Sequence, residues 1–263
     1  MEITHYLYNS FVITADGLRV AIDPGGELYH FSFRPIIPRN IWSSITHVLV
    51  THADPDHHWH TDRLVAESDA TVICGTGLTQ VRDGKRFMLG PRNRGLAFTY
   101  SPSSLVTLDT GEAVDVARMR VTGLAAEHGP LSFRFGPIRK TLHPGPKERI
   151  GYGATGFSLE LEGKRIINLG DTLELLDQWT GIPRPDVLMI PIGGEEVGNT
   201  MGIRGAIEVT EALRPRLVIP CHHNLPSFFK KNANPTDVRS FVEAIEAIGI
   251  ECRDLSRAET VVV

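Results

Sequence analysis

The sequence predicts a layered α/β protein in which β-sheets are covered by helices. Three observations lead to this prediction. A chain of 263 residues with 41% hydrophobic content can bury a full core. Patterns typical of antiparallel strands occupy the first fifth of the chain, and strand patterns alternate with helix patterns later. We expect a single domain over residues 1–263, in which no repeat or low-complexity tract is evident.

The earliest strand pattern is a hairpin at residues 10–24, where two β-rich runs meet at Asp16-Gly17, a dipeptide typical of tight turns. Residues 45–50 form a mostly apolar run, which predicts a strand buried on both faces. Similar runs predict strands at residues 71–74, 118–125, 157–162, 165–169, 187–191 and 217–220. Apolar residues that recur at three- and four-residue steps predict helices at residues 61–68, 201–213 and 236–248.

The composition narrows the class of protein. A net charge of -4 gives no overall basic field, which disfavours nonspecific nucleic-acid binding. No run reaches the roughly 18 apolar residues of a membrane span, and the N-terminus has no secretory pattern. Cys74, Cys221 and Cys252 are too few and too scattered for a disulfide framework or a zinc motif. We therefore expect a cytoplasmic protein, and the sequence leaves open whether it forms a homo-oligomer.

Two irregular stretches are basic although the whole chain is acidic. Residues 82–94 and residues 129–153 each carry five basic side chains against one acidic side chain. A loop as long as the second is usually functional or disordered. One interpretation is that these stretches select an anionic small-molecule substrate, and the alternative is that they are solvated surface loops.

The sequence T-H-A-D-P-D-H-H at residues 51–58 concentrates two aspartates and three histidines in eight residues. Loops usually favour Ser, Asn and Gly instead. We expect a tight loop that aims the donors at positions 52, 54, 56 and 57 inward together, because a helix would spread them around its circumference. Adjacent carboxylates repel unless divalent cations neutralise them. The stretch therefore predicts a metal site, and the alternative is a polar turn with incidental histidines.

Three more donors follow predicted strands elsewhere in the chain. His128 follows an apolar run at residues 121–126, Asp171 follows the strand at 165–169, and His222 follows the strand at 217–220. Layered α/β proteins commonly place their sites at strand ends, so these donors can complete the metal site. Any one of them alone could be an ordinary capping or loop residue.

These motifs together resemble those of the metallo-β-lactamase-fold hydrolases. In chain order they are T-H-x-D-x-D-H, E-H-G-P, L-G-D-T, I-P-I-G-G with a later T-M, and I-P-C-H. The resemblance runs from the N-terminal hairpin to about Pro226. Within the family, the sequence is similar to the branch that includes ascorbate-6-phosphate lactonase. It implies a four-layer αβ/βα sandwich of two mixed β-sheets flanked by helices.

The resemblance also implies a set of ligands for two metal ions. One ion would be held by His52, Asp54 and His128, and the other by Asp56, His57 and His222, with Asp171 bridging both. Asp23, in I-D-P-G, would orient a ligand. The alternative for Asp23 is an ordinary turn carboxylate.

Residues next to or near the candidate ligands are not expected to bind metal. His223 adjoins His222, so in an extended chain it would point elsewhere; it is either a proton donor or a hydrogen-bonded core residue. His58 and His60 are expected to pack against or cap the following helix. Side chains of neighbouring strand residues face opposite ways, so Cys221 is expected to be a small buried residue.

The leading hypothesis is an enzyme, a metal-dependent hydrolase in which two divalent cations, zinc or manganese, lower the pKa of a shared water molecule. The resulting hydroxide would attack an ester, lactone or phosphodiester bond in a small anionic substrate. Such an enzyme would be lactonase-like or phosphodiesterase-like. Asp56 and Asp171 would fix the nucleophile through the metals, and His223 would protonate the leaving group.

Asp54 supports a different hypothesis, because most members of the resembling family have a second histidine at this point. A carboxylate hardens the site and shifts its preference from zinc toward manganese or iron. The oxygen-reducing di-iron members also carry a carboxylate here, so a di-iron redox or oxygen-sensing protein is the alternative. An RNA-processing nuclease fits the acidic net charge less well. A binding module that has lost catalysis is a further alternative, and the completeness of the ligand set argues against it.

Overall fold

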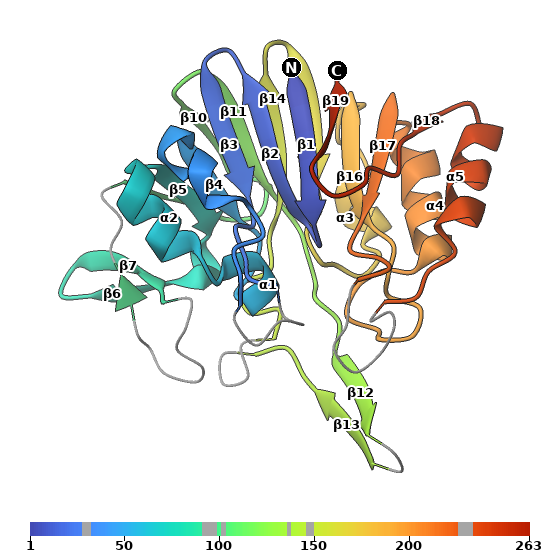
Figure 1. Ribbon diagram of the computed structural model, residues 1–263, viewed down its shortest axis with the longest axis horizontal. Helices are drawn as coiled ribbons and strands as arrows, with labels where there is room; N and C mark the ends of the chain where they lie inside the picture. The colour runs from blue at the N-terminus through green and yellow to red at the C-terminus, as the bar shows by residue number, and fades with distance from the viewer. Residues whose placement is uncertain (28–32, 91–98, 101–103, 136–137, 146–149, 226–233) are drawn as a thin grey trace.

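Two seven-stranded β-sheets lie face to face in the structure of the chain, a computed structural model (Figure 1). The structure describes residues 1–27, 33–90, 99–100, 104–135, 138–145, 150–225 and 234–263. In spatial order the first sheet consists of β19 (Glu259–Val262), β1 (Glu2–Leu7), β2 (Ser10–Ala15), β3 (Leu18–Ile22), β4 (His47–Val50), β5 (Thr71–Gly75) and β9 (Leu105–Leu108). The second consists of β10 (Ala113–Val116), β11 (Met119–Leu124), β14 (Gly156–Leu161), β15 (Lys164–Asn168), β16 (Val187–Pro191), β17 (Leu217–Cys221) and β18 (Glu251–Cys252).

The two sheets share one pattern of strand directions. In the first, β1, β2 and β3 pair antiparallel, and β3, β4 and β5 pair parallel. In the second, β11, β14 and β15 pair antiparallel, and β15, β16 and β17 pair parallel. The carboxyl ends of the parallel strands therefore meet at one edge of each sheet. The antiparallel pair β1 and β19 brings the two chain ends side by side (Figure 1).

Three hydrophobic clusters separate four layers. The central cluster fills the space between the sheets, where Leu49 of β4 and Met189 of β16 lie. Val48 and Val50, on either side of Leu49 in the chain, face the second cluster, which lies beneath the helices of the first half. Leu188 faces the third cluster, beneath the helices of the second half. The predicted four-layer sandwich is confirmed, as is the prediction that the strand before the histidine-rich stretch is buried on both faces.

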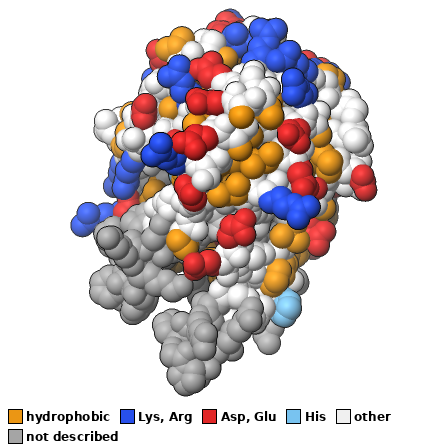
Figure 2. Space-filling model, turned by 90° about the vertical axis from the view of Figure 1, so that its right-hand side faces the viewer, with side chains coloured by type: hydrophobic (Ala, Val, Ile, Leu, Met, Phe, Trp, Pro, Cys, Tyr) orange, Lys and Arg blue, Asp and Glu red, His pale blue; other side chains and the backbone are white. Residues whose placement is uncertain are grey.

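Helices cover the outer face of each sheet. The helices are α1 (Pro55–His58), α2 (Thr61–Ser68), α3 (Leu176–Trp179), α4 (Ile203–Leu213) and α5 (Val238–Ala247), with short 3-10 helices η1 (Arg39–Ser44) and η2 (Thr76–Leu78). In Figure 1, α2 lies on one outer side and α4 and α5 on the other. The face shown in Figure 2 mixes acidic and basic side chains around a small group of hydrophobic ones. No helix in the described ranges is long and apolar enough to cross a membrane.

Most predicted elements are confirmed. Asp16 and Gly17 adopt φ values of 48° and 75°, as a tight turn between β2 and β3 requires. Two predictions of irregular structure are wrong. Residues 129–153 contain a hairpin of β12 (Leu131–Phe135) and β13 (Ile138–Leu142), and residues 82–94 overlap a small sheet of β6 (Thr79–Arg82), β7 (Lys85–Leu89) and β8 (Thr99–Tyr100). Glycine, proline and charge obscured the strand pattern of these segments.

Candidate metal centre

The seven predicted donors converge at the ends of strands from both sheets. His52 and its neighbours follow β4, His128 follows β11, Asp171 follows β15 and His222 follows β17. Each of the seven side chains is buried. The sequence therefore identified side chains that the fold brings to one place, although they come from four separate segments.

The local geometry of the first segment differs from the prediction. Residues 55–58 form the short helix α1 instead of an irregular loop, with Asp54 at its N-cap and Pro55 at its first position. Proline is well suited to the first position of a helix, because its fixed φ is helical and its missing N–H would have no partner there. A single helical turn is too short to spread the donors, so Asp56 and His57 still face the cluster.

The first group of donors is His52, Asp54 and His128, whose candidate ligand atoms all lie within 4.8 Å of one another. Asp54 Oδ2 lies 3.7 Å from His52 Nε2 and 3.5 Å from His128 Nε2. The other carboxylate oxygen, Oδ1, accepts a 2.7 Å hydrogen bond from the backbone N–H of Gly151. Asp54 thus presents one oxygen to the cluster while the loop at Gly151 holds the other.

The second group is Asp56, His57 and His222, again with candidate ligand atoms within 4.8 Å of one another. Asp56 Oδ2 lies 3.5 Å from His57 Nε2 and 3.4 Å from His222 Nε2. Asp171 lies between the two groups: its Oδ2 is 3.0 Å from His222 Nε2, 3.6 Å from His57 Nε2 and 3.9 Å from His128 Nε2. This is the place that a shared ligand of two ions requires.

On three of the four rings, those of His52, His57 and His128, hydrogen bonds on the far side leave Nε2 to face the cluster. His57 Nδ1 donates to Asp23 Oδ2 at 2.7 Å, and His128 Nδ1 donates to the carbonyl of Gly129 at 2.6 Å. Thr51 Oγ1 gives its single proton to Asp23 Oδ2, so its oxygen accepts from His52 Nδ1 at 3.0 Å. Nδ1 of each of these three rings therefore carries a proton, and Nε2 can bind a cation in place of a second proton.

Four inward-facing atoms of these rings and of Asp171 form no hydrogen bonds with other described residues. His52 Nε2, His57 Nε2, His128 Nε2 and Asp171 Oδ1 are buried and have no hydrogen-bond partner among the described residues. Buried polar atoms in native proteins are nearly always paired, and four unpaired ones around one point are therefore unusual. The donor set, imidazole and carboxylate, suits zinc, manganese or iron. The residues present fit bound metal ions.

The charges of the cluster favour cations as well. Burial opposes charge on His57 and on Asp171, but Asp56 and Asp171 hold the pKa of His57 well above its ordinary value, and His222 and His57 hold the pKa of Asp171 below its ordinary value. The pKa of His222 is likewise raised to about 9, because Asp171 and Asp56 outweigh its burial. The pKa of Asp56 is held well below its ordinary value by His57 and His222 despite burial. Buried, ionised carboxylates thus gather where a divalent cation can neutralise them.

Asp23 is a buried orienting residue and not an ordinary turn carboxylate. Its side chain is completely buried and accepts hydrogen bonds from the backbone and hydroxyl of Thr51, from His57 and from Asn9. Asn9 also forms a reciprocal pair with Asn168, in which each amide donates to the other at 2.9 Å. Asn168 Oδ1 further accepts from the N–H of Gly170, directly before Asp171. A buried network therefore joins both halves of the site.

Sequence reasoning missed the residues of this network and the loop that holds Asp54. Asn9, Gly151 and Asn168 carry no local motif and act only through contacts with distant segments. Gly151 adopts a φ of 57°, and a Cβ there would lie 2.1 Å from the Cβ of His128. Asn199, whose amide nitrogen lies 3.4 Å from Asp171 Oδ2, also went unnoticed. A signal existed only for Thr51, which directly precedes the first histidine.

Other predicted residues lie outside the cluster. His223 Nε2 lies 3.3 Å from Asp254 Oδ1, on the far side of the chain from His222, and its role as a proton donor stays a prediction. His58 hydrogen-bonds Thr61 in the first turn of α2, and His60 occupies the N-cap position of that helix, as expected. The thiol of Cys221 is completely buried and its pKa lies well above the ordinary value, so it stays protonated.

The basic stretches are only partly described. Arg82, Lys85 and Arg86 are exposed on the β6–β7 hairpin, and the exposed Lys140 lies on β13. Their companions Arg92, Arg94, Lys147 and Arg149 lie outside the described residues. In Figure 1 the β12–β13 hairpin extends beyond the end of the sandwich at which α1 lies. Selection of an anionic substrate by these stretches stays a prediction.

Comparisons with known proteins agree with this geometry. The sequence model of a family described as "Beta-lactamase superfamily domain" matches residues 2–222. A "UPF0173 metal-dependent hydrolase" of Salinibacter ruber is 26% identical over 264 residues and covers 99% of both chains. A protein of the same description from Archaeoglobus fulgidus is 27% identical over 247 residues, which is 93% of this chain and 91% of that protein.

Solved structures of similar fold come from more distant proteins. Igni18, described as a novel metallo hydrolase from Ignicoccus hospitalis, aligns with a TM-score of 0.68 at 19% identity over 99% of this chain and 97% of that one. CmlA, a diiron β-hydroxylase from Streptomyces venezuelae, aligns with a TM-score of 0.64 at 15% identity over 100% of this chain and 54% of that one. At these identities the likeness shows the fold alone. The similarity to ascorbate-6-phosphate lactonase stays a prediction.

Proposed function

Because the chain belongs to the β-lactamase superfamily, we propose that it is a hydrolase that depends on two divalent metal ions. The observation that carries this proposal is the set of buried Nε2 atoms of His52, His57 and His128, which face the carboxylates of the cluster and have no hydrogen-bond partner in the described part of the chain. Two relatives whose lengths match this chain carry the description "metal-dependent hydrolase", which supports the same conclusion.

Each ion is assigned the donors whose candidate ligand atoms lie close to one another. His52, Asp54 and His128 would hold one ion, and Asp56, His57 and His222 would hold the other. Asp171 would be shared, because its Oδ2 lies within 4 Å of rings from both groups. When bound, such ions make water a stronger nucleophile near neutral pH and stabilise negative charge that develops on a substrate.

The chain itself contributes orientation and charge. Asp23 holds His57 in one tautomer and orientation, and the N–H of Gly151 fixes which oxygen of Asp54 faces the cluster. The donors are buried, and electrostatic interactions between buried groups are stronger than those between groups in water. The reaction that suits this arrangement is hydrolysis of an ester, lactone or phosphodiester bond in a small anionic molecule.

The test compares metal content and turnover in two variants. We expect near two zinc or manganese ions per chain by elemental mass spectrometry, and hydrolysis of a member of a panel of chromogenic esters, lactones and phosphodiesters. Asp171→Ala should lower turnover at least about a hundredfold, because it removes the shared ligand. Asp115→Ala, at an exposed position of β10, is the matched control and should keep full activity. Turnover retained in the Asp171 variant would contradict the proposal.

Asp54 favours one second candidate, a di-iron redox protein. Its carboxylate oxygen faces two histidines, and added negative charge hardens a site and suits iron or manganese better than zinc. Protein purified without oxygen would then contain near two irons per chain and change its absorption when oxygen is admitted. Zinc or manganese in place of iron, with no response to oxygen, would dismiss this candidate.

A further inference from the structure

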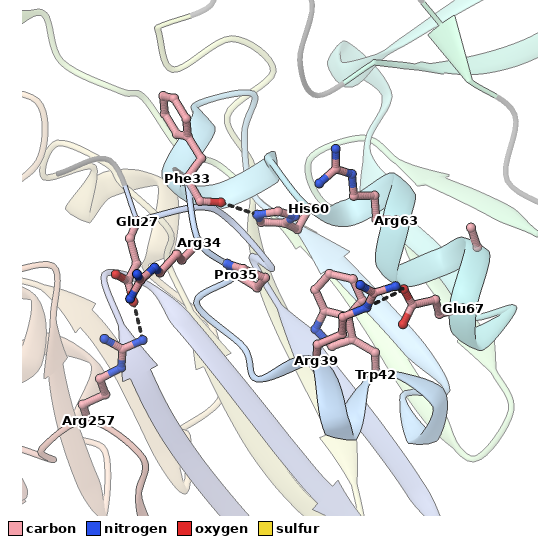
Figure 3. Close-up of a pocket in the computed structure, with 11 residues that line it drawn as sticks. Glu27, Phe33, Arg34, Pro35, Arg39, Trp42, His60, Arg63, Glu67 and Arg257 are labelled. Carbon is pink, nitrogen blue, oxygen red and sulfur yellow. Dashed lines mark hydrogen bonds and ion pairs between the residues drawn. The ribbon is translucent and has the colours of Figure 1, made fainter. Parts of the chain in front are cut away.

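A second concave region of the molecule is separate from the metal centre. An open pocket of about 960 Å³ is lined by residues of segment 33–35, of η1 and of α2, and by Arg257 near the C-terminus (Figure 3). None of its lining residues is one of the seven candidate metal ligands. We call it the arginine pocket, because its lining includes Arg34, Arg39, Arg63 and Arg257. Its volume is within the range of ordinary small-molecule sites.

Two of the four arginines are neutralised by glutamates of the same pocket. Arg39 Nε donates to Glu67 Oε1 at 2.8 Å, and Arg257 pairs with the buried carboxylate of Glu27. The guanidinium groups of Arg34 and Arg63 have no ion pair and no hydrogen bond among the described residues, and both side chains are exposed. The pocket lining therefore carries two uncompensated positive charges in a chain whose net charge is -4.

The frame around these two arginines is held in place. The ring of Trp42 is buried beneath Arg39, and its indole N–H donates to the carbonyl of Ile37 at 3.0 Å. His60 Nε2 bonds the carbonyl of Phe33, directly before Arg34, at 2.6 Å. In Figure 3, Arg34 and Arg63 lie on opposite sides of His60. Two positive charges on opposite sides of one pocket favour a ligand with two anionic groups over a ligand with a single one.

We propose that the arginine pocket binds a small molecule that carries two phosphate groups. A guanidinium group offers paired N–H donors that match phosphate oxygens, so Arg34 and Arg63 would each take one phosphate. Arg39 and Arg257, each already paired with a glutamate, would add attraction at longer range. The sugar-sized body between the phosphates would lie against Pro35 and Phe33, which supply apolar surface. This site does not depend on the proposed hydrolase activity, because the two sites share no residue.

The test is calorimetric titration of the full, metal-loaded chain with fructose 1,6-bisphosphate at low salt. We expect saturable binding that weakens at least about tenfold in the double variant Arg34→Ala/Arg63→Ala, since a hydrogen bond between charged groups contributes that much or more. Arg204→Ala, at an exposed arginine of α4, is the matched control and should bind as the parent chain does. Fructose 6-phosphate, with a single phosphate, should bind more weakly than the bisphosphate.

Three outcomes would overturn the proposal. Equal affinity in the double variant and the parent chain would show that these arginines bind no phosphate. Loss of binding in Asp171→Ala would place the bisphosphate at the metal centre instead. Equal affinity for the two sugar phosphates would remove the requirement for two anionic groups. Retained binding in Asp171→Ala would support the proposal, even if that variant had lost all turnover. The Asp171 variant therefore separates a failure of the pocket proposal from a failure of the hydrolase proposal.

Discussion

The two halves of the metal centre are built differently on similar scaffolds. Both sheets pass from antiparallel to parallel pairing, and both present donors at the ends of strands. The N-terminal half provides four donors within the six residues 52–57, after the single strand β4. The C-terminal half provides three donors from three separate loops. A local motif thus builds one half, whereas the other half exists only when distant loops are in place.

This difference determines how each donor is supported. Within the N-terminal half, Asp23 and Thr51 orient His52 and His57 through a dense set of hydrogen bonds. His128, in contrast, lies against the loop of Gly151, where a Cβ would lie 2.1 Å from the histidine Cβ. Gly151 touches Asp54 and His128, both of the first group, whereas Asp23 hydrogen-bonds His57 of the second group. Substitutions at these two supports should therefore affect the two ions to different extents, and this expectation can be tested.

The largest effect should come from Gly151→Ala. The new Cβ would meet His128, and the N–H that fixes Asp54 would shift, so the ion of the first group should be lost. We expect about one ion per chain instead of two by elemental mass spectrometry. The free energy of unfolding should fall by roughly 2–4 kcal/mol, from the contact and the positive φ together.

The control for this prediction is Gly163→Ala. Gly163 also has a positive φ, 71°, but a Cβ there would have no atom within 4 Å. Only the backbone cost of roughly 1–2 kcal/mol should remain, with two ions retained. Equal metal loss in both variants would mean that the approach of Gly151 to His128 does not hold the site together.

An intermediate effect is expected for Asp23→Asn. An amide in place of the carboxylate removes the negative acceptor that fixes the proton on His57 Nδ1, so the ion of the second group should bind roughly 10–100-fold more weakly. Competition with a metal-binding indicator dye measures this affinity. Asp16→Asn is the matched control, because Asp16 has the same φ of 48° but lies in the exposed β2–β3 turn. A variant of Asp23 with unchanged affinity would contradict the orienting role.

The contrast between the halves also explains what the sequence could predict. The hairpin at Asp16-Gly17, the strand β16 and the helix α2 were predictable because each has a regular apolar pattern or a strong turn signal within a few residues. The metal-binding segment was predictable for the same reason, since its donors are adjacent. The helix α1 escaped because four residues are too few to show a helical period, although Pro55 at its first position was a usable signal.

The supports of the site could not be predicted from local pattern. Gly151 looks like any other glycine in a basic, glycine- and proline-rich stretch until the fold brings it against His128. Asn9 and Asn168 are separated by 159 residues, and Asn9 lies in the turn between β1 and β2 whereas Asn168 ends β15. Their importance comes from complete burial, which makes an unpaired amide costly, and burial is a property of the assembled sheets.

The smallest effect on metal binding, and the sharpest test of how the halves are joined, should come from the Asn9 and Asn168 pair. Asn9→Ala and Asn168→Ala should each destabilise the chain by about 1–3 kcal/mol, because each leaves a buried amide partly unpaired. The double variant should lose less than the sum, with a coupling energy of about 1–2 kcal/mol. Metal affinity should fall less than tenfold, since Asp23 keeps its bonds to Thr51 and His57.

Urea unfolding of the four chains measures this coupling, and the exposed pair of Thr4 and Thr260 provides a control cycle. Their hydroxyl oxygens lie 2.8 Å apart and also join segments far apart in the sequence, but solvent reaches them. Water can replace the lost partner there, so the coupling should stay below about 1 kcal/mol. Similar coupling in both cycles would show that burial adds nothing to the Asn9 and Asn168 pair. The two halves of the site would then be joined by the packing between the sheets alone.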